Sequence, residues 1–162
     1  MIDKNSSIFV AGHNGMVGSA VKKNLLDRGY KNIVTKSKSE LNLTDQKATN
    51  LFFQNLNPDA VILCAAKVGG ILANNNYKAD FISDNLMIGA NVIRASHQHN
   101  VKKLINLGSS CIYPKEAKIP IKEEDLLSGR LEPTNEPYAI AKIAALKMCE
   151  SYYSQHDKNF YS

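Results

Sequence analysis

Tyr138 and Lys142 are the two residues whose types and spacing could support catalysis most directly. They stand four apart in the segment YAIAK, which places them on one face of a helix, one turn from each other. A free phenol has a pKa of about 10, and a neighbouring ammonium lowers that pKa because it favours the phenolate. We therefore predict that the pair acts as a general acid toward a carbonyl group that is being reduced. The alternative is an ordinary contact on the helix surface.

Two hydroxyl groups are expected at the same place. The segment KLINLGSS, residues 103–110, is predicted to be a strand that ends in Ser109 and Ser110. Open α/β sheets bind their ligands at the carboxyl ends of the strands, so both hydroxyls should lie beside one cleft. There a serine could donate a hydrogen bond to the substrate oxygen on which charge develops.

Gly12, Gly15 and Gly18 separate a predicted strand over 7–11 from a predicted helix over 15–28. Because glycines have no side chains, a pyrophosphate can approach the backbone N–H groups of this loop, and the positive end of the helix dipole attracts it. The spacing G-x-x-G-x-x-G differs by one position from the dinucleotide-binding pattern G-x-G-x-x-G. The strand–turn–helix context favours a dinucleotide site over a plain turn with close helix packing.

The end of the second predicted strand indicates which dinucleotide would bind. An acidic residue there would bind a free ribose 2′-hydroxyl, but the segment reads TKSKSE, and Lys36 and Lys38 suit a 2′-phosphate. NADP(H) is therefore favoured over NAD(H), unless the lysines are simply surface residues. Asp45, at the start of the following helix, would either contact the adenine or complement the helix dipole.

Short apolar runs alternate with longer amphipathic stretches, which is the pattern of β-α-β units. Strands are predicted over 7–11, 32–35, 59–66 and 103–110, with a fifth beginning near Asn159, and helices over 15–28, 45–55, 77–99 and 138–156. We expect loops over 67–76 and 111–137, and solvated His97 and His99 at a helix end. The fold class is therefore α/β: a Rossmann-type, doubly wound parallel sheet with helices on both faces.

The composition agrees with one globular domain. The chain has 162 residues, 44% of them hydrophobic and 22% charged, and three separated cysteines that we expect to be reduced thiols. The longest apolar run, from Ala60, is shorter than the roughly 20 residues of a membrane span, and no secretory signal is visible. We expect a cytoplasmic protein that binds neither membrane nor nucleic acid, because the lysines behind the net charge of +5 are scattered.

Five segments together resemble the GDP-L-fucose synthase family of the extended short-chain dehydrogenase/reductases: AGHNGMVGSA, ELNL, AAKVGGI, SSCIYP and EPTNEPYAIAK. The resemblance implies a catalytic triad of Ser109, Tyr138 and Lys142. It also implies that Cys111, which would otherwise be interpreted as a small buried residue, is one of two acid/base groups. The family inverts C3 and C5 of GDP-4-keto-6-deoxy-D-mannose and then reduces the C4 ketone with NADPH, and its members form homodimers. No metal is expected.

The residues predicted to bind the cofactor lie in the glycine loop, after the second predicted strand, at the end of the third, and on the last predicted helix. They are Gly12, Asn14, Gly15, Met16, Val17, Gly18, Lys36, Lys38, Asn42, Leu43, Ala65, Ala66, Tyr138 and Lys142. Asn14 departs from the family, in which an arginine commonly helps to hold the 2′-phosphate. The preference for NADP therefore depends more on the two lysines.

Residues 1–162 are predicted to form an incomplete NADP-binding Rossmann domain. The family's second acid/base group, a histidine, and nearly all of its GDP-sugar-binding domain are expected beyond Ser162, so we expect little turnover from these residues alone. Two alternatives stay open: another nucleotide-sugar epimerase or reductase on the same scaffold, or a non-catalytic NADP-binding module.

Overall fold

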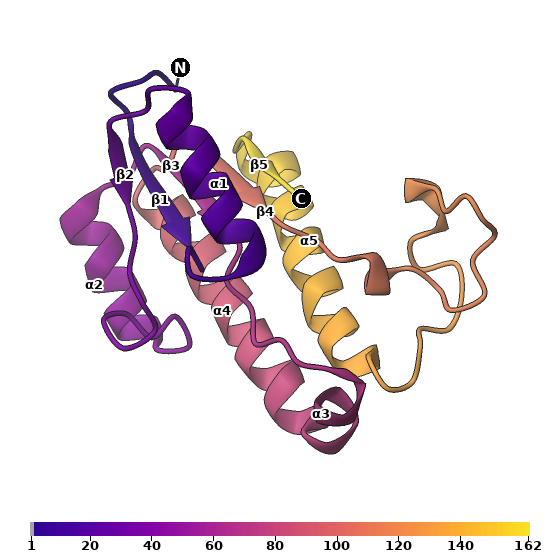
Figure 1. Cartoon of the computed structure of the whole chain (residues 1–162). Coiled ribbons are helices and arrows are strands. Elements are labelled where there is room, and N and C mark those ends of the chain that lie inside the picture. The colour runs from indigo at the N-terminus through magenta and orange to yellow at the C-terminus, as the bar shows by residue number, and fades with distance from the viewer. Residues whose placement is uncertain (1) are drawn as a thin grey trace.

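A single parallel sheet organises the chain, as the computed structural model of residues 2–162 shows (Figure 1). The strands are β1 (Ser7–Ala11), β2 (Asn32–Val34), β3 (Ala60–Leu63), β4 (Lys103–Asn106) and β5 (Phe160–Tyr161). Their order in the sheet is β2-β1-β3-β4-β5, and every neighbouring pair is parallel. The chain first moves from β1 to β2 and then returns to place β3 on the other side of β1. The ends of β1 and β3 therefore form the point at which the strand order reverses, where such sheets bind ligands.

Helices cover both faces of the sheet, as the doubly wound prediction requires. They are α1 (Met16–Asp27), α2 (Gln46–Leu56), α3 (Ile71–Asn76), α4 (Lys78–Gln98) and α5 (Glu136–His156), with short 3-10 turns η1 (Ser110–Ile112) and η2 (Glu123–Asp125). Helix α1 packs on one face, whereas α2, α4 and α5 pack on the other. None of these helices is both long and apolar enough to cross a membrane.

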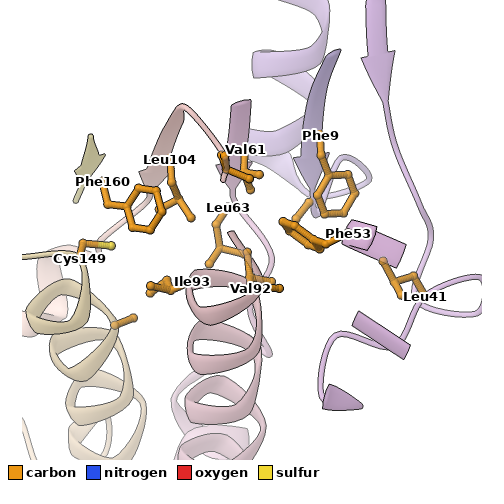
Figure 2. Packing of buried hydrophobic residues seen from close by; sticks show 14 residues of the cluster. Phe9, Leu41, Phe53, Val61, Leu63, Val92, Ile93, Leu104, Cys149 and Phe160 are labelled. Carbon is orange, nitrogen blue, oxygen red and sulfur yellow. The ribbon is translucent and has the colours of Figure 1, made fainter. Parts of the chain in front are cut away.

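The main core lies between the sheet and the three helices of the second face (Figure 2). One row of side chains crosses the strands in register: Phe9, Val61, Leu104 and Phe160. Each of the four is at most 2% exposed, because α2, α4 and α5 cover this row. The alternation of strand residues thus turns one side of each strand into a continuous apolar layer.

The opposite face of the sheet is only partly covered. The next row in register runs from Val10 through Ile62 and Ile105 to Tyr161. Helix α1 buries Val10 completely, but it does not extend to the far strands, and Tyr161 is 48% exposed. A cavity of about 800 Å³ lies over β3, β4 and β5 on this side. This α1 face therefore presents an apolar strip that no helix of residues 2–162 covers.

The structure differs from the sequence prediction at several element ends. Strand β3 ends at Leu63 and β4 ends at Asn106, whereas both were predicted to continue for three or four more residues. After these points the backbone leaves the sheet to form the walls of the site. The predicted loop 67–76 contains α3, and α5 begins at Glu136 with Pro137 in its first turn, where a proline loses no helical hydrogen bond.

The prediction that His97 is solvated is wrong. Its ring packs between α4 and α5, with ring centroids 4.8 Å from Tyr152 and 4.5 Å from His156. Its Nδ1 is buried and has no hydrogen-bond partner among residues 2–162. His99 is also partly buried, and its Nε2 lies 2.9 Å from Asn50 Oδ1. The two helices pack closely at this end, which sequence periodicity did not reveal.

Burial lowers the pKa of His97, and the nearby positive charges of His156 and Lys158 add to the effect. The unfolded chain therefore takes up a proton at a pH where the folded chain does not, so the free energy of unfolding should fall as the pH drops through about 6.5. We expect urea denaturation between about pH 7 and pH 5 to show this loss, and His97→Phe to reduce it. An unchanged pH dependence in the variant would assign the loss to other groups.

Candidate active site

The loop after β1 lies against the loop after β3 at the reversal point of the sheet. Gly12 has φ +84°, a conformation that favours glycine. A Cβ at Gly12 would lie 2.6 Å from the backbone nitrogen of Ala65, which is closer than real contacts allow. The two loops can therefore approach each other only because position 12 has no side chain.

Gly18 and Gly15 are required to different degrees. A Cβ at Gly18 would lie 2.1 Å from the carbonyl oxygen of Gly12, so the first turn of α1 could not pack on the loop with any side chain there. At Gly15 the nearest atom would be 3.4 Å away, which is an ordinary contact. Gly15 is the N-cap of α1 and has no side chain to occupy the free N–H groups of the first turn. These donors and the helix dipole remain available to an anion.

A cleft of about 480 Å³ opens from this glycine loop across the ends of β1, β2 and β3. Its volume is in the range of small-molecule sites, which is roughly 300–1,000 Å³. Its walls include twelve of the residues predicted to bind a cofactor: Gly12, Asn14, Gly15, Met16, Val17, Gly18, Lys36, Lys38, Asn42, Leu43, Ala65 and Ala66. The glycine cradle and the free helix N-terminus fit a dinucleotide with its pyrophosphate on the loop.

Charges at the far end of the cleft are arranged around Lys36. Its Nζ lies 3.3 Å from Glu40 Oε1; the Lys36 side chain is partly buried, and that of Glu40 is about half exposed. Hydrogen bonds from the Ser37 hydroxyl and backbone N–H, and then from Lys36, lower the pKa of Glu40 to about 2. Glu40 is therefore ionised at neutral pH and competes with any phosphate for Lys36. Lys38 forms no ion pair within residues 2–162.

A second, smaller pocket of about 240 Å³ collects three of the predicted catalytic side chains: Ser109, Cys111 and Tyr138. Ser109 and Cys111 come from the turn after β4, and the Cys111 thiol donates a hydrogen bond to Ser109 Oγ over 3.2 Å. Tyr138 comes from the first turn of α5. Three polar side chains from two separate segments thus line one pocket.

Glu132 fixes the backbone just before α5. Its carboxylate accepts hydrogen bonds from the backbone N–H groups of Thr134 (3.0 Å) and Asn135 (3.1 Å) and from the Thr134 hydroxyl. These bonds lower the pKa of Glu132, with the hydroxyl as the largest contribution, so the clamp stays ionised at neutral pH. It fixes where the helix starts and therefore where Tyr138 stands.

The predicted effect of Lys142 on Tyr138 is wrong for this structure. Burial raises the pKa of the Tyr138 phenol, Cys111 adds to the increase, and the Ser109 hydroxyl opposes it. Lys142 itself is only 7% exposed, and burial lowers its pKa. It lines neither the cleft nor the pocket. The two side chains share a helix face as predicted, but the amine lies deeper in the protein and does not lower the phenol's pKa.

The structure also bears on the predictions for Ser110 and Asp45. Ser110 does not line the pocket of Cys111 and Tyr138; it lies with Ser109 beside a second cavity, between η1, α5 and β5. Asp45 caps α2, because its carboxylate accepts the Ala48 N–H over 2.9 Å. The dipole interpretation of Asp45 is therefore the one that the structure supports.

The segment after β3 connects the cleft and the pocket, since Val68 lines both. The side chain of Asn85 on α4 holds this segment by a pair of bonds: the Lys67 N–H donates to Oδ1 over 2.8 Å, and Nδ2 donates to the Lys67 carbonyl over 2.9 Å. Lys67 Nζ also pairs with Asp84 at 3.0 Å. Sequence reasoning treated this segment as a loop and missed Asn74 and Asn135, which line the pocket, because isolated asparagines in irregular segments carry no periodic signal.

Comparison with known proteins supports the resemblance. The GDP-L-fucose synthase of Escherichia coli (strain K12) is 57% identical over 155 residues, which cover 96% of this chain and 48% of the relative. The solved structure of MlghC, a GDP-mannoheptose C4 reductase from Campylobacter jejuni with NADP bound, is 46% identical with a TM-score of 0.95, covering 99% of this chain and 51% of that one. A GDP-L-fucose synthetase from Naegleria fowleri bound to NADP is 29% identical with a TM-score of 0.87, covering 99% and 53%.

The chain spans about half the length of the curated relatives it matches. Within that half, residues 8–162 match the model of the NAD dependent epimerase/dehydratase family. The match includes the glycine loop, the cleft and the pocket in one continuous stretch. The chain therefore belongs to the NAD dependent epimerase/dehydratase family.

Proposed function

We propose that this chain is the cofactor-binding half of an NADPH-dependent GDP-L-fucose synthase, which epimerises GDP-4-keto-6-deoxy-D-mannose at C3 and C5 and then reduces its C4 ketone. One observation carries the proposal: Ser109, Cys111 and Tyr138 line one pocket, and that pocket shares Val68 with the glycine cleft. A sugar in the pocket and a dinucleotide in the cleft would therefore meet. The similarity to the Escherichia coli synthase supports the choice of substrate.

NADP(H) is the cofactor of this proposal. Gly12, Gly15 and Gly18 would hold its pyrophosphate at the start of α1, and Lys36 and Lys38 would bind its 2′-phosphate. When bound, it supplies the hydride for the reduction. The NADP-bound structure from Naegleria fowleri supports the assignment.

In the epimerisation, Cys111 would exchange a proton at the carbons next to the C4 carbonyl. Protons there are acidic because the enolate places its charge on oxygen, which the Ser109 hydroxyl can stabilise by a hydrogen bond. A thiol is one of the side-chain groups that act as general acid or base in such proton transfers. Inversion needs a second acid on the opposite face of the ring, which we assign to the part of the protein beyond Ser162.

In the reduction, Tyr138 would protonate the C4 oxygen as the hydride reaches C4. The raised pKa of Tyr138 keeps the phenol protonated at neutral pH, so it is ready to donate. Lys142, one turn further along α5, would help to restore the proton of the phenol after each turnover. Each turnover converts the ketone, one hydride and one proton into the alcohol.

The domain assignment follows from the same argument. We infer that residues 1–162 form an incomplete Rossmann domain and that the sugar-binding half lies outside them. The length of the relatives and the uncovered strip over β3, β4 and β5 support this inference. We further infer a cytoplasmic homodimer that does not bind nucleic acid, in keeping with its free cysteines and scattered lysines.

A second candidate is a GDP-sugar C4 reductase without epimerase activity. The similarity to the GDP-mannoheptose C4 reductase favours it, because that relative covers the same residues at 46% identity. The two candidates differ in what they require of Cys111: only an epimerase needs a proton-exchanging group beside Ser109.

A chimera tests the proposal and separates the candidates. We would join residues 1–162 to the C-terminal half of the Escherichia coli relative and follow NADPH oxidation with GDP-4-keto-6-deoxy-D-mannose. We expect turnover by the chimera and little by residues 1–162 alone. Cys111→Ser should lower the rate of solvent deuterium incorporation at C3 and C5 by about 10²–10⁴-fold and leave NADPH affinity unchanged. Ketone reduction without exchange at C3 and C5 in the unmodified chimera would favour the simple reductase. Unchanged exchange in Cys111→Ser would remove Cys111 from its role, and an inactive chimera would contradict both candidates.

Cofactor selectivity should depend on the lysines of the cleft. The double variant Lys36→Ala/Lys38→Ala should weaken NADPH binding by roughly tenfold to a hundredfold, because charge-assisted bonds to the 2′-phosphate are lost, and leave NADH binding unchanged. Fluorescence titration of residues 1–162 measures both. Glu40→Gln is the matched control: it releases Lys36 from its partner and should strengthen NADPH binding. Equal losses for NADPH and NADH would contradict the assignment.

A further inference from the structure

Asn74 is a buried polar residue in the wall of the catalytic pocket. It lies in α3, is 7% exposed, and lines the same pocket as Ser109, Cys111 and Tyr138. Its Nδ2 donates two hydrogen bonds, to the carbonyl oxygens of Gly69 (2.9 Å) and Gly70 (3.2 Å). These bonds define which end of the amide is the oxygen. A reversed amide would place its oxygen, which only accepts hydrogen bonds, against two carbonyl oxygens.

The other end of this amide has no partner. Asn74 Oδ1 is buried, and no donor from residues 2–162 forms a hydrogen bond to it. A buried acceptor without a donor costs about 1–3 kcal/mol, and native structures contain few of them. The cost is offset if the oxygen finds a donor in the working state of the protein, when a ligand fills the pocket.

The chemistry of the pocket limits what that donor can be. A ketone oxygen accepts hydrogen bonds only, so it must face the hydroxyls of Ser109 and Tyr138, which can donate. Asn74 Oδ1 accepts only, so it cannot bind the ketone and must bind an O–H or N–H group. A keto-sugar ring carries hydroxyl groups beside its ketone and offers such a donor.

We propose that Asn74 Oδ1 accepts a hydrogen bond from a ring hydroxyl of the bound keto-sugar. With the ketone at Ser109 and Tyr138 and a hydroxyl at Asn74, only one orientation of the ring satisfies both sides of the pocket. Asn74 is then a specificity-determining residue, and a sugar that lacks this hydroxyl is discriminated against. Bringing the oxygen to the ring would require a shift of helix α3, which is short and whose Ile71 and Leu72 are more than 70% exposed.

A purely structural role makes different predictions. If Asn74 only fastens the Gly69–Gly70 turn through Nδ2, any variant that loses these donors should weaken all sugars equally. If Oδ1 binds a hydroxyl, the loss should depend on whether the sugar carries that hydroxyl. Asn74→Asp keeps acceptor oxygens and loses the donors, whereas Asn74→Leu loses both, so the two variants separate the roles.

The test is a cycle of variants and substrates in the chimera described above, since the assignment rests on the proposed function. Calorimetry would give the affinities of GDP-4-keto-6-deoxy-D-mannose and its 2-deoxy and 3-deoxy analogues for the unmodified chimera and for both variants. We expect one analogue to bind about tenfold more weakly than the parent sugar to the unmodified chimera and to Asn74→Asp, and as well as the parent to Asn74→Leu. NADPH affinity should be the same in all three proteins, because Asn74 does not line the cleft.

Other results would overturn the assignment. Analogue losses that are equal in all three proteins, or an Asp variant that behaves like the Leu variant, would leave Asn74 with its turn-fastening role only. If the unmodified chimera turned over the parent sugar but neither analogue bound more weakly, the assignment of Asn74 would be wrong and the proposed function would stand. If the unmodified chimera did not bind the parent sugar at all, the proposed function would fail and Asn74 with it.

Discussion

Replacing Tyr138 by Phe in the chimera should lower kcat for ketone reduction by about 10²–10⁴-fold, the usual contribution of a positioned general acid. The substitution keeps the ring, its burial and its place in the first turn of α5, and it removes only the hydroxyl. Because burial raises the pKa of this phenol, the wild-type group is protonated throughout the neutral range. The loss should therefore be nearly constant from about pH 6 to pH 8, and it should appear in single-turnover measurements of NADPH oxidation.

The same helix offers a control for this experiment. Tyr153 also lies on α5 but is 53% exposed and lines a different cavity. Tyr153→Phe removes an identical hydroxyl and should leave kcat and NADPH affinity within twofold of wild type, by the rule that most surface changes alter stability by about 0.5 kcal/mol or less. If Tyr138→Phe also kept near-normal turnover, another group would have to protonate the C4 oxygen.

Gly12→Ala should destabilise the chain strongly and abolish NADPH binding. The new methyl group would meet the backbone of Ala65 at 2.6 Å, so either the glycine loop or the end of β3 must move. Left-handed strain of roughly 1–2 kcal/mol adds to an overpacking cost of roughly 1–3 kcal/mol, so we expect a loss of about 2–5 kcal/mol. Urea denaturation of residues 1–162 measures the free energy of unfolding, and fluorescence titration measures the binding.

Gly29 provides the matched control, because its φ of +82° is nearly that of Gly12 but nothing lies within 4 Å of a Cβ built there. Gly29→Ala should therefore cost only the strain, roughly 1–2 kcal/mol, and should leave NADPH binding intact. Equal losses of stability in the two variants, with binding retained in both, would mean that the close approach of the two loops is not needed. In that case the glycine would be required for its conformation alone.

Local signals in the sequence were sufficient for the scaffold. The apolar runs at Ser7–Ala11 (β1) and around Val61 predicted buried parallel strands, and the structure confirms both. Prolines and small residues after β4 correctly marked the long connection before α5. The ends of β3 and β4 were predicted too late, because apolar residues beyond Leu63 line the cleft instead of continuing the sheet.

Side-chain environments were harder to predict. Tyr138 and Lys142 stand one turn apart as their spacing requires, yet burial sets the pKa of each, and burial depends on neighbours from distant segments. His97 seemed to lie at a free helix end, but Tyr152 and His156 from another helix cover it. Asn74 carried no signal at all, since its role depends on a pocket that four separate segments form.

The sequence by itself determined the succession of strands and helices along the chain, the glycine loop and the residue types available for chemistry. Each of these depends on contacts within a few positions of the chain. The tertiary structure alone decided that Gly12 must lie against Ala65 and that Ser109, Cys111 and Tyr138 share a pocket that Ser110 does not line. It also decided that the oxygen of Asn74 has no donor within residues 2–162. These outcomes depend on which distant segments the parallel sheet brings to its carboxyl edge, and on the burial that follows, which no short stretch of sequence encodes.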